Sequence, residues 1–238
     1  FPYTTLFRSL PLGDSLARYF LHDAIRGVDY LLSRPEVDPN RIGVTGNSGG
    51  GTQSSLIMMA EPRLAAAVPV TFIMNRETYL HTSGAQDAEQ IWRGFTANGL
   101  DHEDILLAMA PKPVRVLAVQ SDFFPIEGTR RTVERCKRQW ELFGKADEVD
   151  LVEDASTHCY TPRMACSAAT FFAKHLLNKE VDAESFPISP FPPEQLWCTE
   201  SGQVRGEIEG AEFTFEANQA RLEAAVQLRK ALPRAEAL

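Results

Sequence analysis

The sequence predicts an α/β protein in which a mostly parallel sheet is flanked by helices. Short apolar segments alternate with helical segments along the middle of the chain, which is the pattern of parallel βαβ units. The 238 residues are 44% hydrophobic and 24% charged, the composition of a globular protein large enough for one sizeable core. The third observation is a serine set among glycines, in RIGVTGNSGGG (41–51), where an apolar segment gives way to a helix.

The first helix is expected to run to about Ser33, because Asp14 or Ser15 can cap its start and apolar residues then recur at helical spacing. Four short apolar runs bounded by turn residues are expected to be strands. These strands are RIGVTG (41–46), LAAAVPVTFI (64–73), PVRVLAVQ (113–120) and EVDLVED (148–154).

Helices are expected after the first, third and fourth strands. They are GTQSSLIMMAE (51–61), a segment at 127–144 that ends in Gly144, and a segment at 161–179 with Pro162 in its first turn. Residues 74–110, between the second and third strands, are expected to be mixed and partly helical.

The charge balance argues against a nucleic-acid surface. Acidic residues number 32 against 24 basic ones, a net charge of −8, whereas phosphate binding needs concentrated positive charge. No uncharged apolar run approaches the roughly 20 residues needed to span a bilayer. The four cysteines form no CxxC pair and no zinc-type spacing with histidine, so we expect free, partly buried thiols and no metal site. Neither oligomeric state nor compartment follows from the sequence.

Both ends of the chain differ from its middle. The first nine residues, FPYTTLFRS, resemble a translated sequencing-adapter oligonucleotide, and 1–9 is therefore expected to be an artefact. Residues 10–180 are expected to form the catalytic core, with 74–110 as a cap-like insertion. From Glu184 a proline-rich stretch reads as a linker, and 181–238 is expected to be an extension or the start of a second domain.

The glycine-rich stretch fits the G-x-S-x-G pattern, with Ser48 between Asn47 and Gly49. In this pattern the serine occupies a strained turn from a strand into a helix, and its hydroxyl projects above the sheet. We expect that a side chain at Gly46 or Gly50 would clash with the backbone. The amide of Gly49 is the predicted oxyanion donor. A phosphate-binding loop is the alternative, but the lysine of that motif is absent.

A serine hydroxyl needs a base and an acid that orients the base. Asp122 follows the third strand, and His158 follows the fourth. In a parallel sheet both would reach the edge that carries Ser48, in the chain order Ser, Asp, His. Several alternatives stay open. The rival acids are Glu127, Glu153 and Asp154. The histidines His22, His81, His102 and His175 are assigned packing, surface or pocket-lining positions, and Trp92 and Phe95 are expected to pack rather than to bind substrate.

Three blocks of sequence resemble the α/β-hydrolase superfamily, and more closely its acetyl xylan esterase-like and dienelactone hydrolase-like branch. They are DAIRGVDYLLSRPEVDPNRIGVTGNSGGG, QSDFFPIEGTRRTVE and EDASTHCYTP, within residues 13–178. The resemblance implies a Ser48 nucleophile, an Asp122 acid, a His158 base and carboxylester hydrolysis without a cofactor. The implied substrate is a small-molecule or carbohydrate ester, with no nucleic-acid or membrane partner.

The chain departs from that family before the nucleophile. Such enzymes take a second oxyanion donor from a loop after an early strand, whereas only one helix and one strand are expected ahead of Ser48. Because a missing donor costs roughly 2–4 kcal/mol of transition-state stabilisation, we expect a partial α/β-hydrolase fold that is inactive or poorly folded by itself. Ser48-dependent hydrolysis of p-nitrophenyl acetate by the 238-residue chain would contradict this expectation.

Two other functions remain as hypotheses from the sequence. A prolyl-oligopeptidase-like serine peptidase would share the serine turn and the order of the three residues. A hydrolase-like domain that only binds or scaffolds would keep the fold without catalysis.

Overall fold

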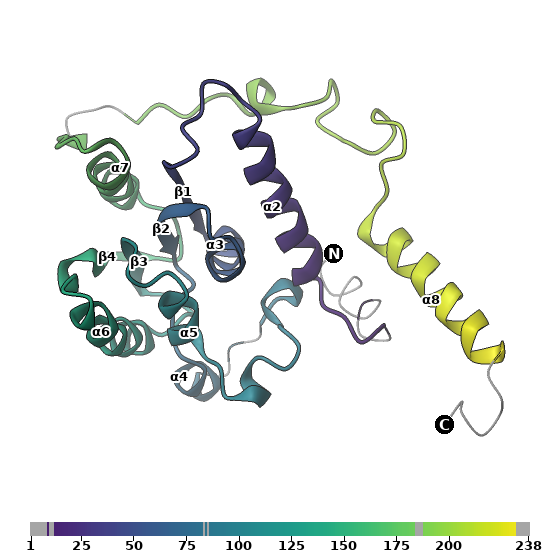
Figure 1. Ribbon diagram of the computed structural model, residues 1–238, viewed down its shortest axis with the longest axis horizontal. Helices are drawn as coiled ribbons and strands as arrows, with labels where there is room; N and C mark the ends of the chain where they lie inside the picture. The colour runs from purple at the N-terminus through teal and green to yellow at the C-terminus, as the bar shows by residue number, and fades with distance from the viewer. Residues whose placement is uncertain (1–8, 10–11, 83, 85, 184–187, 232–238) are drawn as a thin grey trace.

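The computed structural model describes residues 9, 12–82, 84, 86–183 and 188–231. Its centre is a parallel sheet of four strands in the order β1-β2-β3-β4 (Figure 1). The strands are β1 (Ile42–Asn47), β2 (Leu64–Val70), β3 (Val114–Ser121) and β4 (Val149–Thr157). The predicted mostly parallel sheet is therefore confirmed. The second strand is shorter than predicted and the fourth is longer.

Each connection between strands contains at least one helix, as parallel pairing requires. The helices are α2 (Ala17–Leu32), α3 (Gly49–Ala60), α4 (Arg76–His81), α5 (His102–Leu107), α6 (Ile126–Leu142), α7 (Pro162–Leu177) and α8 (Thr214–Ala231). Single turns of 3-10 helix occur at Ala88–Gln90, Thr96–Asn98 and Ala146–Glu148, and a slightly longer one at Pro193–Leu196. Within the described residues, no helix has the length and apolar character needed to cross a bilayer.

The first helix begins later than the sequence indicated. Leu16 occupies the N-cap position of α2 and makes no side-chain cap. The Ser15 hydroxyl accepts from the amide of Ala17, the first residue of α2, at 3.3 Å, so of the two predicted caps Ser15 does contact the helix start. The two side chains are used nearby. The Asp14 carboxylate accepts a hydrogen bond from the Ser15 amide at 2.9 Å, and the Ser15 hydroxyl donates to the Ile91 carbonyl at 2.6 Å. The Ser15 hydroxyl therefore joins the start of α2 to the distant 74–110 segment.

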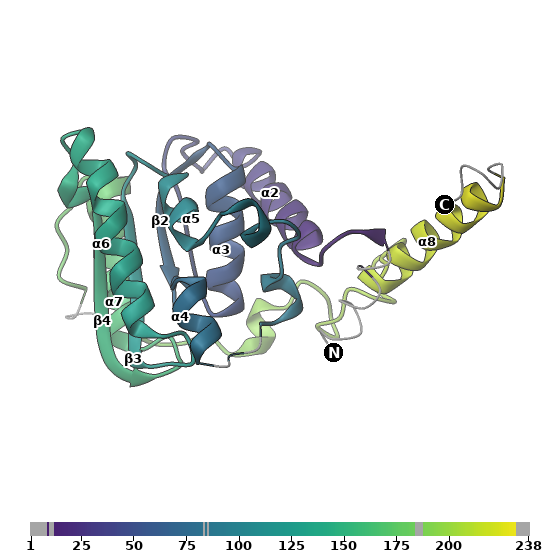
Figure 2. The same cartoon turned by 90° about the horizontal axis from the view of Figure 1, so that it is seen from below.

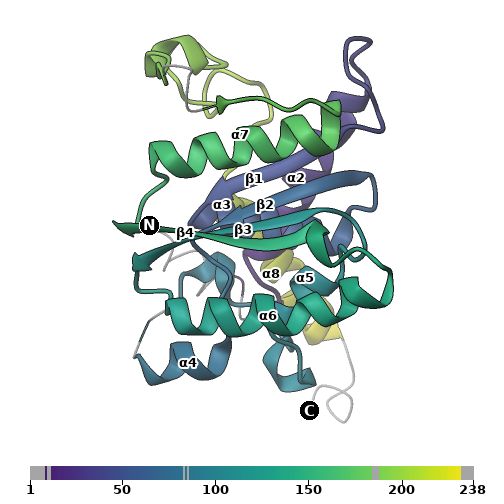
Figure 3. The same ribbon diagram turned by 90° about the vertical axis from the view of Figure 1, so that its left-hand side faces the viewer.

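Helices cover both faces of the sheet (Figure 3). Helix α7 packs on one face, where its Met164 and Phe171 meet Val68 and Leu117. Helices α3 and α6 cover the other face, and α2 packs against α3. A hydrophobic core lies on each face of the sheet. Side chains of β2 enter the two cores alternately because successive residues of a strand point to opposite faces. Thus Ala67 belongs to the core on the α3 and α6 side.

The C-terminal helix α8 extends away from the sheet and its covering helices (Figure 2). It touches the start of α2 through polar groups. The Tyr19 hydroxyl donates to Asn218 Oδ1 at 2.6 Å, and Arg221 forms an ion pair with Asp14 at 2.9 Å. The predicted boundary between a core and a C-terminal extension stays a prediction. The proposed artefact falls, except for Ser9, outside the described residues, as do 184–187 in the linker and the end of the chain from 232.

Candidate active site

The predicted nucleophile lies in a strained turn between β1 and α3. Ser48 has φ +58° and ψ −115°, a conformation that residues with a side chain rarely adopt. Its amide donates to the Val70 carbonyl and to Thr71 Oγ1, both at 3.1 Å. Its carbonyl accepts from the Thr52 amide at 2.8 Å. The Ser48 hydroxyl itself forms no hydrogen bond with the residues that the structure describes, so it is free to meet a substrate or a base.

Two of the surrounding glycines leave no room for a side chain. A Cβ added to Gly46 would lie 2.4 Å from the Gly50 carbonyl oxygen, and one added to Gly51 would lie 2.4 Å from the Val70 carbonyl oxygen. The predicted clash at Gly46 is confirmed. The predicted clash at Gly50 is wrong, because a Cβ there would meet nothing within 4 Å. Gly51 is the second required glycine, since it is the residue of α3 that packs on β2.

Thr71, which sequence reasoning missed, supports this turn. It follows β2 with φ +47°, which is costly for a β-branched residue. Its hydroxyl donates to Asn47 Oδ1 at 2.8 Å and accepts from the Ser48 amide at 3.1 Å. Thr71 therefore fixes the residues on both sides of the bend. Its place in an apolar run gave no sign of this role, because the pairing joins the ends of two strands.

The predicted acid and base are hydrogen-bonded to each other. His158 Nδ1 lies 2.8 Å from Asp122 Oδ1 and 3.0 Å from Oδ2. The Asp122 side chain is 2% exposed and the His158 side chain 22%. The carboxylate is thus covered while the imidazole reaches the surface. By accepting a hydrogen bond from Nδ1–H, the Asp122 carboxylate fixes the imidazole tautomer and leaves Nε2 as the free base.

The three predicted catalytic residues lie at the C-terminal ends of the strands. Ser48, Asp122 and His158 directly follow the last residues of β1, β3 and β4. The strand ends are aligned, since Asn47 pairs with Val70 across β1 and β2. With about 4.8 Å between strands, His158 must lean back across the sheet to approach β1.

Aromatic rings bridge that span. The His158 ring centroid lies 4.3 Å from Phe123 and 5.9 Å from Phe124. Phe124 is 5.8 Å from Phe72, which follows the end of β2. Phe72 in turn borders Gly51 in α3. The imidazole is therefore linked through packed rings to the helix that begins at the predicted nucleophile.

The rival acids have other partners or positions. Glu153 binds Arg130 at 2.6 Å, and Asp154 accepts from the Thr161 hydroxyl at 2.6 Å. These hydrogen bonds lower the pKa of both carboxyls. Glu127 lies exposed in the first turn of α6. Within the described residues, Asp122 is the carboxylate that contacts His158.

The other histidines lie elsewhere. His22 is in α2 and His81 ends α4 at the surface. His175 pairs with Glu148 at 3.2 Å. His102 is fully buried, and burial lowers its pKa to about 3. It is thus a core histidine and not a pocket-lining one.

The aromatic pair of the 74–110 segment packs as expected. Phe95 is buried in the core, and Trp92 meets it edge-on with the ring centroids 5.0 Å apart. The cysteines are all free thiols as predicted, but only Cys136 and Cys166 are buried or partly buried, whereas Cys159 and Cys198 are exposed.

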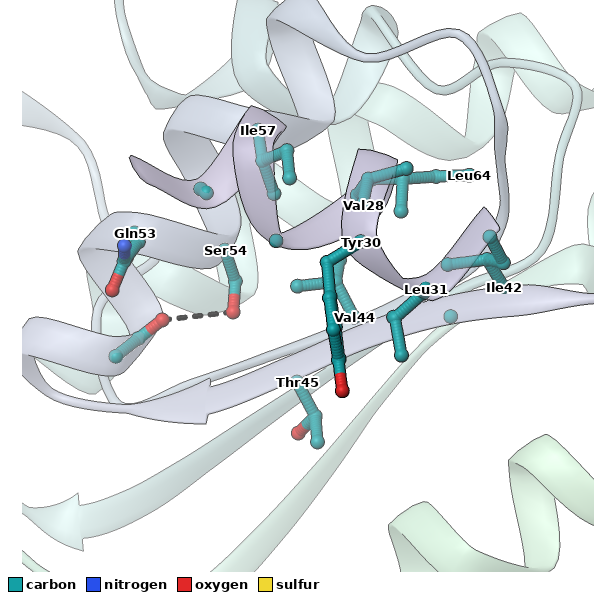
Figure 4. A pocket seen from close by; sticks show the side chains of 14 residues that line it. Val28, Tyr30, Leu31, Ile42, Val44, Thr45, Gln53, Ser54, Ile57 and Leu64 are labelled. Atoms are coloured by element: carbon teal, nitrogen blue, oxygen red, sulfur yellow. Dashed lines mark hydrogen bonds between the residues drawn. The ribbon is translucent and has the colours of Figure 1, made fainter. Parts of the chain in front are cut away.

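A cavity of about 460 Å³ lies beside β1 (Figure 4). Ser48, Asp122 and His158 do not line it. Val28 and Leu31 of α2, Val44 and Thr45 of β1, and Ile57 of α3 line it. Strand β1 is the first strand of the described chain and pairs there with β2 alone. The cavity is therefore a space along the outer edge of the sheet, whereas the serine turn, the carboxylate and the imidazole lie at the ends of the strands.

The chain is similar in sequence to known hydrolases and peptidases. A model of the prolyl oligopeptidase family matches residues 14–129. "Putative hydrolase YtaP" of Bacillus subtilis (strain 168) is 24% identical over 174 residues, which cover 72% of this chain and 58% of that protein.

Solved structures are similar as well. The structure of Methylesterase BT1017 superposes with a TM-score of 0.62 at 21% identity, covering 87% of this chain and 46% of that one. A CE15 glucuronoyl esterase from Caldicellulosiruptor kristjansonii gives a TM-score of 0.57 at 18% identity, covering 74% and 55%. The chain thus spans about half the length of these relatives. The parallel sheet, the strained serine turn and these likenesses show that the chain has an α/β-hydrolase-like fold.

Proposed function

We propose that the protein is a serine carboxylesterase that cleaves small acyl esters through an acyl-enzyme. Ser48 Oγ attacks the ester carbon while His158 Nε2 takes the hydroxyl proton. His158 then gives that proton to the departing alcohol. Asp122 holds the imidazole in the required tautomer, and the Gly49 amide stabilises the negative oxygen. Water, activated by His158, releases the acid and regenerates Ser48. No cofactor takes part in this scheme.

One observation carries the proposal. A covered carboxylate, Asp122, is bonded to the ring nitrogen of a surface-reaching imidazole, His158, at the sheet edge where Ser48 occupies a strained turn. A histidine that served only packing would have no need of a buried anionic partner, whose desolvation is costly. A serine in a strained turn with a free hydroxyl fits a nucleophile, because strain of this kind gathers at functional sites.

Carbohydrate esters are the proposed substrate class, with acetyl esters of plant polysaccharide as the specific candidate. The esterase neighbours support an ester substrate. The match to the prolyl oligopeptidase family favours a second candidate, a serine peptidase with the same three residues. Both candidates predict a nucleophilic Ser48, whereas a purely binding domain predicts none.

Covalent labelling tests the proposal better than ester turnover does. The scheme has a single oxyanion donor, the Gly49 amide, so turnover is expected to be slow, whereas labelling needs only one attack by Ser48. A fluorophosphonate probe is expected to label the chain, and Ser48→Ala is expected to abolish the label. Ser156→Ala is the matched control, since it removes a hydroxyl two residues from His158 and should leave labelling intact. Equal labelling of the Ser48→Ala variant, or no labelling of the folded chain, would refute the assignment.

Protection from the probe separates the two candidates without requiring turnover. An acetylated xylo-oligosaccharide is expected to slow the labelling of Ser48, and an aminoacyl-proline amide is not. The reverse result would favour the peptidase.

A further inference from the structure

A carboxylate lies next to the proposed oxyanion donor. Glu89 is in the 3-10 turn Ala88–Gln90 of the segment between β2 and β3. Its Oε1 is 3.7 Å from the position that a Cβ on Gly49 would take. Gly49 immediately follows Ser48, so the Glu89 carboxylate lies beside the turn that carries the proposed nucleophile and would contact any side chain at position 49.

The Glu89 carboxylate is not paired within the described part of the chain. No Lys, Arg or His forms an ion pair with it there, and no side chain of another described residue hydrogen-bonds to it. Burial raises the pKa of the Glu89 carboxyl, and the neighbouring charge of Asp87 acts in the same direction. By contrast, the partly or fully buried carboxylates of Glu153 and Glu61 bind arginines that lower their pKa.

The backbone around Glu89 is held in place. Trp92 Nε1 donates to the Glu89 carbonyl at 2.8 Å. Asp87 and Gln90 form a capping box around the turn, and Gln90 is buried. A fixed backbone holds this half-buried carboxylate, which forms no ion pair among the described residues, in a constant position beside Gly49, as binding of a substrate group requires.

A structural role at the start of α3 is the simpler reading of Glu89. A carboxylate near a helix N-terminus is stabilised by the helix dipole, most strongly when it accepts from the free amides of the first turn. No hydrogen bond from an amide of α3 to Glu89 occurs among the described residues. The hydrogen bond that lowers its pKa comes from its own backbone amide, and the rest of its acceptor capacity is left for another group.

We infer that Glu89 is a specificity-determining residue that binds a hydrogen-bond donor of the substrate close to the reacting carbon. The inference rests on the proposed function, since it takes Ser48 as the nucleophile. An ammonium group would gain most from the carboxylate, and a sugar hydroxyl would bind in the same way. A substrate carboxylate at that position would be repelled by Glu89.

Three diphenyl phosphonate probes test the inference through labelling rates. In each, Ser48 Oγ bonds to phosphorus, phenol leaves, and His158 carries the serine proton to it. The probes share one α-aminoalkyl group and differ at its nitrogen, which is a free ammonium, an N-acetyl group or an anionic N-succinyl group. The ammonium probe is expected to label about tenfold faster than the succinyl probe, since opposite charges attract at this separation.

The Glu89→Gln variant is expected to bring that rate ratio close to one. Asp87→Asn is the matched control, because it removes a charge from the same turn while keeping an acceptor oxygen for the cap. It should preserve most of the ratio. An unchanged ratio in Glu89→Gln, with Ser48-dependent labelling by the N-acetyl probe, would overturn the role of Glu89 and leave the proposed function standing. Failure of all three probes to label Ser48 would overturn both.

Discussion

Replacing Gly51 by alanine tests why the serine turn needs its glycines. The new Cβ would lie 2.4 Å from the Val70 carbonyl oxygen and 2.9 Å from Phe72 Cβ. Neither atom is the end of a flexible side chain. The Val70 carbonyl also accepts the Ser48 amide, so a shift of β2 that relieved the clash would loosen the turn. Gly50→Ala is the matched control, because its Cβ would meet nothing within 4 Å.

The expected magnitudes follow from these contacts. Overpacking of this kind costs about 1–3 kcal/mol, while alanine in place of glycine in a helix returns at most about 1 kcal/mol. Gly51→Ala is thus expected to lower the free energy of unfolding by up to about 2 kcal/mol when the helix gain of about 1 kcal/mol is subtracted in full. Gly50→Ala keeps the helix gain without the clash and is expected to raise it by up to about 1 kcal/mol.

Urea unfolding followed by circular dichroism measures the difference. With a denaturant dependence of about 2 kcal/mol per molar, the midpoints of the two variants should differ by roughly 1 M, with Gly50→Ala the higher. Equal midpoints, or a higher midpoint for Gly51→Ala, would show that α3 does not pack on β2 as closely as described.

Three further predictions concern His102, Cys136 and Thr71. Burial, with the nearby Arg76 cation, holds the pKa of His102 at about 3. Between about pH 6.5 and pH 3 the unfolded chain therefore carries a proton on this histidine that the folded chain does not. As the pH is lowered through 5, the free energy of unfolding should fall by about 1.4 kcal/mol per pH unit. His102→Gln should remove that slope in urea titrations, and an identical slope in both proteins would contradict the burial. Burial raises the pKa of Cys136 to about 12, so a maleimide at pH 8 should modify the exposed Cys159 in the native chain and Cys136 only after unfolding, as read by peptide mass spectrometry. Thr71→Val removes two hydrogen bonds of the serine turn and should cost about 1–2 kcal/mol while slowing fluorophosphonate labelling; wild-type values for both would exclude a supporting role.

The order of elements could be predicted from the sequence because each depends on local pattern. The apolar runs predicted the four strands and placed Asp122 within two residues of the end of β3, whereas the predicted end of β4 at Asp154 fell three residues short of the observed end at Thr157, which His158 follows. Even the partnership of these two residues followed, because parallel strands bring their ends to one edge.

Features that depend on contacts between distant segments could not be predicted. Gly50 and Gly51 are indistinguishable in sequence, and only the packing of α3 on β2 shows which one needs to be glycine. Thr71 holds the turn through a bond across two strands, and Glu89 comes from a segment without clear periodicity. The bond from the Ser15 hydroxyl to the distant Ile91 carbonyl could not be predicted either, whereas its contact with the Ala17 amide at the start of α2 is local.

The central claim is that Ser48, His158 and Asp122 act as one relay. A crystal structure of the chain after reaction with a fluorophosphonate tests it most directly. We predict a bond between Ser48 Oγ and phosphorus, a phosphonyl oxygen within hydrogen-bond distance of the Gly49 amide, and His158 Nε2 within hydrogen-bond distance of Ser48 Oγ while its Nδ1 stays on Asp122. An adduct on another residue, or an imidazole too far from Ser48 to exchange a proton, would contradict the account.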